Sequence, residues 1–130
     1  MESALRTSLV DWLASDTELS ASLNAVQEEG PSPAPAPTVS IAASASADWS
    51  TKTSTGREVR LALELLDRSD DPATSAAIAT RIEQRIATMA PAQPGFRIVS
   101  TQFLCSRVER RARSIRAVLL EYRFRLLSTP

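Results

Sequence analysis

Strict alternation of apolar and polar residues is clearest in one stretch of the chain, residues 57–67. The apolar residues of this stretch share one parity: Val59, Leu61, Leu63 and Leu65. A period of two predicts a β-strand with one buried face and one solvated face. Because no other stretch alternates as cleanly, we place this strand in the centre of a sheet.

Two shorter patterns predict strands on either side of it. From Thr38 to Trp49 the apolar residues again share one parity, namely Val39, Ile41, Ala43, Ala45, Ala47 and Trp49. From Ile115 to Leu127 they are Val118, Leu120, Tyr122, Phe124 and Leu126. We expect the first of these strands to pair with 57–67 through a polar hairpin connection, Asp48 to Gly56, in which Gly56 adopts a turn conformation.

The remaining strand pattern, Phe96 to Arg110, is irregular. One face carries Val99, Thr101, Phe103 and Cys105, whereas Val108 has the opposite parity. A β-bulge between Leu104 and Arg107 reconciles the two halves. Cys105, in an apolar strand, is interpreted as a small buried hydrophobic residue.

Helical periodicity appears twice. Residues Ser3 to Ser15 form an amphipathic helix capped by Ser3, and Asp16 caps a second short helical piece. The sequence Asp71-Pro72 starts another helix, whose buried face repeats at every third or fourth residue and which Pro91 ends. Between the helical start and the first strand, the proline-rich segment Glu28 to Pro37 is predicted to be a surface loop.

The predicted order is therefore helix, strand, strand, helix, strand, strand. We predict an α+β fold, an antiparallel four-stranded sheet covered by helices, as a single domain over residues 1–130. Its buried sheet face is predicted to include Val59, Leu61, Leu63, Leu65, Leu120, Tyr122 and Phe124.

Composition argues against catalysis. The chain has no His, a single Cys and only three Gly, which excludes His-based catalytic pairs, Cys/His zinc sites and a glycine-rich phosphate loop. We therefore predict no enzymatic activity, no metal and no cofactor. The N-terminus lacks the features of a signal peptide and no stretch is long enough to span a membrane. A lone Cys is compatible with the reducing cytoplasm.

Charge is balanced overall but unevenly distributed. Residues 97–130 carry eight Arg and two Glu, and the rest of the chain carries the opposite excess. The hairpin between the last two strands holds five of these arginines, and we predict that it contacts neighbouring subunits or proteins together with the connection Asp48–Gly56. The candidate interface residues are Trp49, Lys52, Thr53, Arg57, Arg107, Arg110, Arg111, Arg113 and Arg116. A solvated turn without a partner is the plain alternative.

The order of the pieces resembles the tail terminator, or tail completion, proteins of tailed phages and gene transfer agents. The resemblance rests on LRTSLVDWLASDTELSASL, PTVSI, DWSTKTSTGREVRLALELLDR, ATSAAIATRIEQRIATMA, FRIVSTQFLCSRVERR and RAVLLEYRFRLL. It covers nearly the whole chain, and its most specific part is the WSTKT segment with the strand that follows. In place of the aromatic and acidic turn of many relatives, this chain has the Pro/Ala segment.

The resemblance implies a structural protein that assembles in the bacterial cytoplasm and ends up at the tail–neck junction of a virion or gene-transfer-agent particle. It would form a homo-oligomeric, typically hexameric ring that ends polymerisation of the tail tube protein and meets a head-completion, stopper or adaptor protein. Double-stranded DNA would pass through the lumen without its sequence being read. Two alternatives stay open: a cytoplasmic protein- or RNA-binding module, and a small enzyme subunit that needs residues from a partner.

Overall fold

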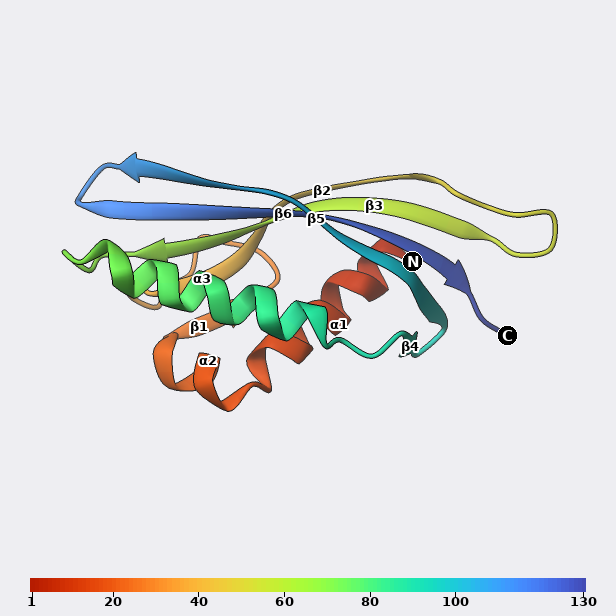
Figure 1. Cartoon of the computed structure of the whole chain (residues 1–130), viewed down its shortest axis with the longest axis horizontal. Helices are drawn as coiled ribbons and strands as arrows, with labels where there is room; N and C mark the ends of the chain where they lie inside the picture. Colours follow the sequence, from red (N-terminus) through yellow and green to blue (C-terminus); the bar gives the residue numbers. More distant parts are fainter.

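The computed structural model describes all 130 residues, and it places three helices on one face of a curled six-stranded sheet (Figure 1). The helices are α1 (Glu2–Ala14), α2 (Thr17–Ser22) and α3 (Pro72–Ala87). The strands are β1 (Ala25–Gln27), β2 (Thr38–Asp48), β3 (Gly56–Asp67), β4 (Ala92–Gln93), β5 (Phe96–Arg111) and β6 (Ile115–Ser128).

The predicted α+β class is confirmed, but the prediction of four strands is wrong. The strands lie in the order β1-β2-β3-β6-β5-β4, and β1 runs parallel to β2, so the sheet is mixed. The two additional strands contain three and two residues. Segments this short cannot display a period of two, which is why the hydrophobic pattern missed them.

The predicted central strand and the predicted core face are confirmed. β3 lies between β2 and β6, and its four alternating apolar residues are at most 3% exposed. On β6, Leu120, Tyr122 and Phe124 are equally buried. Helices α1 and α3 supply the opposing layer through Leu5, Leu9, Leu13, Ile78, Ile82 and Ile86.

The helix starts follow local capping chemistry in two of three cases. The carboxylates of Asp16 and Asp71 accept hydrogen bonds from Leu19 N and Ala73 N, as expected for N-caps. The expectation for Ser3 is wrong, because α1 begins at Glu2 with Met1 in the cap position. Helix α3 ends at Ala87, ahead of Pro91.

Bulges change which side chains share a face. The register of β2 shifts between Ile41 and Ala43, so Ala43, Ala45 and Ala47 lie on the face opposite Ile41, contrary to prediction. In β5 the predicted bulge is confirmed by a shift between Phe103 and Cys105, and a second shift occurs after Ile98. Cys105 is exposed, so its prediction as a buried residue is wrong.

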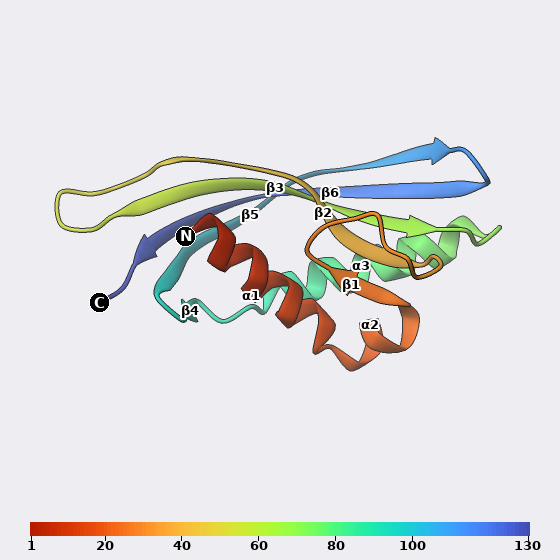
Figure 2. The ribbon, with the colours of Figure 1, turned by 180° about the vertical axis from the view of Figure 1, so that it is seen from behind.

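Seen from behind, α1 and the segment that follows it cover the β2 side of the sheet (Figure 2). The segment 28–37 has no helix or strand, as predicted, and returns the chain from β1 to β2. None of the three helices is both long and apolar enough to cross a membrane.

Candidate assembly site

The two segments predicted to contact neighbours lie at opposite ends of the sheet (Figure 1). The antiparallel pairing of β3 with β6 places Gly56 beside Leu127 and Asp67 beside Arg116. The connection Asp48–Gly56 therefore leaves one end of the sheet, and the β5–β6 turn leaves the other. The two segments therefore face in different directions and can meet different neighbours.

The connection Asp48–Gly56 is ordered by its own hydrogen bonds. Thr51 Oγ1 accepts from Ser54 N at 3.0 Å, and Ser50 Oγ accepts from Gly56 N at 3.0 Å. These bonds keep the polar tip, which includes exposed Lys52 and Thr53, in a defined shape. A preformed tip loses little conformational entropy when a partner binds it.

The base of this connection is packed more tightly than its tip. The side chain of Trp49 is partly buried, and the Arg125 guanidinium lies 5.5 Å from its ring centroid. Gly56 has no positive φ, contrary to its predicted turn conformation. Glycine is required at this position because a Cβ would lie 2.4 Å from the Trp49 carbonyl oxygen. Arg57 is exposed at the start of β3.

The arginines of the β5–β6 hairpin divide into two groups. Arg111 donates to Glu64 at 2.7 Å and to Glu109 at 3.1 Å, and Arg107 pairs with Glu109 at 3.1 Å. The hydrogen bond to Glu64 raises the pKa of Arg111. Arg111 therefore serves partly to hold the hairpin against β3.

At the hairpin's base, Arg116 lies 3.8 Å from buried Asp67 and donates to the Ser69 carbonyl. Arg110 and Arg113 are exposed and have no carboxylate within ion-pair distance. Arg113 and Ser114 both have positive φ, which sets the tight turn. The two free guanidiniums are thus held at a fixed, projecting end of the sheet, where they can meet an anionic partner.

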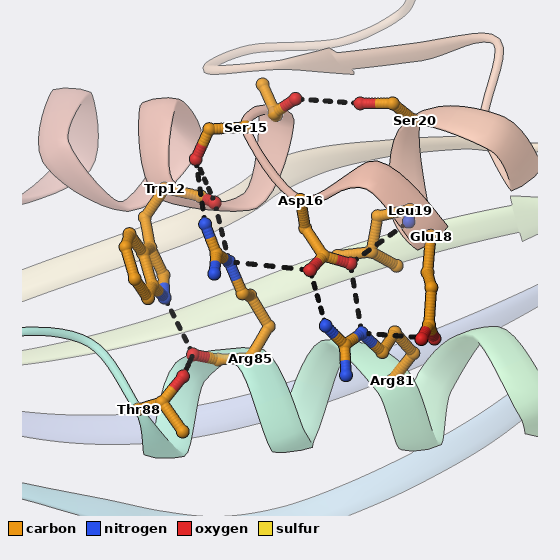
Figure 3. A network of polar contacts seen from close by, with 10 residues as sticks. Trp12, Ser15, Asp16, Glu18, Leu19, Ser20, Arg81, Arg85 and Thr88 are labelled. Atoms are coloured by element: carbon orange, nitrogen blue, oxygen red, sulfur yellow. Dashed lines mark hydrogen bonds and ion pairs between the residues drawn. The ribbon is translucent and has the colours of Figure 1, made fainter.

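A second arginine cluster, which sequence reasoning did not identify, is internal. Asp16 accepts from Arg81 at 2.9 Å and 2.5 Å, and Arg85 donates to Trp12 O and Ser15 Oγ (Figure 3). The Arg85 guanidinium stacks 3.3 Å from the Trp12 ring centroid, and the Trp12 indole donates to Arg85 O. The hydrogen bond from Arg81 lowers the pKa of Asp16 to about 2.

This cluster ties α1 and α2 to α3 rather than offering a binding site. Asp16 is 4% exposed and both of its charged partners come from the facing helix. The spacing of Arg81 and Arg85, four residues apart on one helix face, was the available signal. Its acidic partner lies 65 residues away in sequence, so spacing alone could not identify it.

The other feature missed by sequence reasoning is apolar. Val99, Phe103 and Val108 are 41%, 43% and 60% exposed, and all three belong to β5. Their apolar character was visible in the sequence, but it does not tell whether a neighbour covers the strand. No group of His, Cys, Asp or Glu side chains is arranged to hold a metal ion.

Comparisons with known proteins agree with one another. The sequence profile of the family described as "Tail completion protein gp17" matches residues 7–127. A search of curated protein sequences finds no match.

Two solved structures share the fold. A chain in the "Virion of native gene transfer agent (GTA) particle" is 23% identical, with a TM-score of 0.78, and the match covers 98% of this chain and 96% of that one. The "bacteriophage SPP1 gp17 protein" is 20% identical, with a TM-score of 0.64 and coverage of 95% and 88%. At these identities both establish the fold of nearly the whole chain.

Proposed function

The chain belongs to the tail completion protein gp17 family, and from that premise we propose that it forms a homo-oligomeric ring at the head-proximal end of a tail tube. The ring ends tube polymerisation and joins the tail to a stopper or adaptor protein, while double-stranded DNA passes through its lumen. The family is structural and not enzymatic, which confirms the prediction that the chain is not an enzyme. The family match over residues 7–127 is the observation that carries this proposal.

The geometry supports a protein with a different neighbour at each end. The connection Asp48–Gly56 and the β5–β6 hairpin project in opposite directions, so in a ring one set faces the tube and the other faces the neck (Figure 1). The similar chain of the gene transfer agent is part of a virion, which supports assembly into a particle for this chain. We propose the tail–neck junction as its place, reached after assembly in the bacterial cytoplasm.

The RNA-binding alternative finds less support. A stacking platform requires exposed aromatic residues interleaved with basic ones. Phe103 is the one exposed aromatic on the sheet, whereas Tyr122 and Phe124 are buried. Burial raises the pKa of the Tyr122 hydroxyl, so this group stays neutral.

The proposed contact is tested by reversing the two unpaired charges of the hairpin, Arg110→Glu with Arg113→Glu. Arg111 is left in place because its ion pairs with Glu64 and Glu109 support the fold. We expect a folded protein by circular dichroism that no longer caps tubes or joins heads to tails. The matched control is Arg68→Glu with Arg97→Glu, which makes the same change of charge at two exposed arginines outside the hairpin and without ion pairs.

Three outcomes separate the explanations. Normal particle assembly by the hairpin variant would mean that the cluster is a solvated turn. Loss of assembly in both variants would point to net charge rather than to the hairpin. Normal capping with loss of salt-sensitive, sequence-independent DNA binding would assign the arginines to passing phosphates instead of a protein neighbour.

A further inference from the structure

Strand β5 is an open edge of the sheet. β4 pairs only with Phe96 and Arg97, and Ile98 N donates to Pro91 O, so the outward side of β5 is unpaired from Val99 to Arg111. A long unpaired edge presents a row of main-chain donors and acceptors to any other chain. Natural edges are usually short or charged, and this one is sixteen residues long and, besides the charges at its far end, exposes Val99, Phe103 and Val108.

The opposite edge of the same sheet is also open. β1 covers β2 only from Thr38 to Ser40, which leaves Ala43 to Asp48 unpaired on the outward side. The side chains there are small: Ala43, Ala45 and Ala47 on one face, Ser44 and Ser46 on the other. On the helix-covered face Ser44 accepts from Arg6 and donates to Glu2 of α1, whereas the three alanines on the other face are exposed.

Strand direction makes the two edges compatible. Three antiparallel pairings separate β2 from β5, so the two strands run in opposite directions. If a second copy is related by rotation about an axis along the strands, its β2 lies antiparallel to β5. A contact between two different edges repeats from copy to copy, and it gives a ring, as the proposed function requires, when the rotation between copies closes.

Residues that lie side by side on neighbouring strands form cross-strand rows, and these rows also continue across such a contact. One row on the helix-covered side consists entirely of valine and leucine: Val108, Val118, Leu65, Val39 and Val26. If neighbouring copies lie at the same height along the strand direction, the exposed Val108 of one copy meets Val26 of the next. A row on the other face ends in Cys105 and Ala43, which would likewise meet.

Charges at the two edges are complementary. The far end of β5 and the turn after it carry Arg107, Arg110 and Arg113, of which only Arg107 has an acidic partner. Beside the β2 edge, Glu28 and Glu29 share a single guanidinium, Arg6, and the Glu29 side chain is 79% exposed. The carbonyl oxygen of Glu28 accepts from Ile41 N, so Glu28 lies beside this part of β2. Ser40, which precedes Ile41 by one residue, stands in the same cross-strand row as Arg107.

We propose that the open edge of β5 binds the β1–β2 edge of a second copy of this chain, in antiparallel orientation, and that this contact closes the ring. The inference rests on the proposed ring and names the surface that forms it. Pairing of β5 with β5 is disfavoured, because it would join two strands that each carry a net positive charge.

Disulfide trapping with the native Cys105 tests the contact. Cysteine is introduced singly at Ala43, Ala45 or Ala47, which share the face of Cys105, and each variant is oxidised alone and with polymerised tube protein. Within one chain the two cysteines lie three strand spacings apart, about 14 Å, too far for an internal bridge. The same three substitutions with Cys105→Ser are the matched controls.

We expect one of the three variants to give a ladder of linked copies on a denaturing gel, because every copy carries both halves of the contact. Wild-type protein that forms Cys105–Cys105 dimers, with no ladder in any variant, would overturn the inference in favour of a β5–β5 contact. Rings seen by electron microscopy without cross-links at any position would overturn the inference but keep the ring. Absence of rings, with and without tubes, would instead contradict the proposed function.

An edge variant gives a second, independent measurement. Val108→Asp places a charge on the exposed side chain in the middle of the proposed contact. We expect native circular dichroism and loss of rings, whereas Gln84→Asp, exposed on α3, keeps them. Rings of normal size and number from Val108→Asp would contradict the proposed contact.

Discussion

Strands β3 and β5 both alternate apolar with polar residues, yet the fold uses them in opposite ways. β3 has a strand on each side and helices beneath it, and Leu61, Leu63 and Leu65 are buried. β5 has a full neighbour on one side only, and Phe103 and Val108 are about half exposed although they stand next to buried Tyr122 and Val118. Alternation therefore reports which residues share a face, while burial depends on what other segments lie against that face.

The largest contrast should appear when one apolar residue in each strand is truncated. Leu63→Ala, at a site that is 1% exposed, is expected to lower the free energy of unfolding by about 2–5 kcal/mol, since it removes buried surface and leaves a cavity. Val108→Ala, at 60% exposure, should change it by less than about 0.5 kcal/mol. Urea denaturation of the monomer measures both. Equal losses would mean that β5 is covered in solution.

The same contrast explains what the sequence could predict. Val59 to Leu65 form an unbroken alternating run, so strand, face and central position were all readable. β5 contains two bulges, and each inserts a residue that shifts the parity of those that follow. Cys105 follows the second bulge and therefore lies beside Glu121, on the face opposite Phe103 and the helices, and the residue at which a bulge occurs is not encoded by the alternation itself.

Candidate site residues were predictable by type but not by role. Five arginines around one hairpin were apparent from sequence alone. Arg111 pairs with Glu64 on β3, whereas Arg110 and Arg113 remain free. The register places Arg107, not Arg111, in the row of Glu64, so even the strand pairing would not have identified this ion pair. The sequence distance between Arg111 and Glu64 is 47 residues, far beyond any spacing rule.

The start of β3 should be nearly as sensitive as its middle. A Cβ on Gly56 would lie 2.4 Å from Trp49 O and 2.8 Å from Leu126 O, and both atoms are backbone. Gly56→Ala is therefore expected to cost about 1–3 kcal/mol of unfolding free energy, as overpacking generally does. Thr55→Ala, one residue earlier and exposed, is the control and should be close to neutral. A neutral Gly56→Ala would show that this hairpin base yields easily.

The helix layer that distinguishes β3 from β5 should loosen in acid. The pKa of Asp16 falls from its ordinary 3.8 to about 2 because Arg81 hydrogen-bonds to it. A lowered pKa stabilises the fold above the unfolded value, and this stabilisation is lost as pH falls from about 4 to about 2. Asp16→Asn keeps a capping oxygen but removes the charge, so it should be less stable than wild type at pH 7.

The difference in stability between wild type and Asp16→Asn isolates the contribution of this carboxylate from that of the other groups that titrate in acid. Thermal melts between pH 7 and pH 2 should show a constant gap above about pH 4 that closes below it. Two curves that stay parallel down to pH 2 would mean that the Asp16–Arg81 contact contributes nothing to stability.

The smallest expected effect concerns the thiol on the open strand. Cys105 Sγ donates to Glu121 Oε2 at 2.8 Å, and this hydrogen bond raises the pKa of Cys105. Because the thiolate is the reactive form, Cys105 should be exposed and yet slow to alkylate with iodoacetamide near neutral pH. Glu121→Gln removes the charge, so the pH–rate curve should move to lower pH and the rate at pH 8 should rise severalfold. In urea, where the contact is absent, both proteins should react alike, and identical curves in the folded state would exclude an effect of Glu121.

The same reaction also reports on the open edge itself. If a second copy covers β5, alkylation of wild-type Cys105 should slow as rings form, which no residue of β3 can reveal.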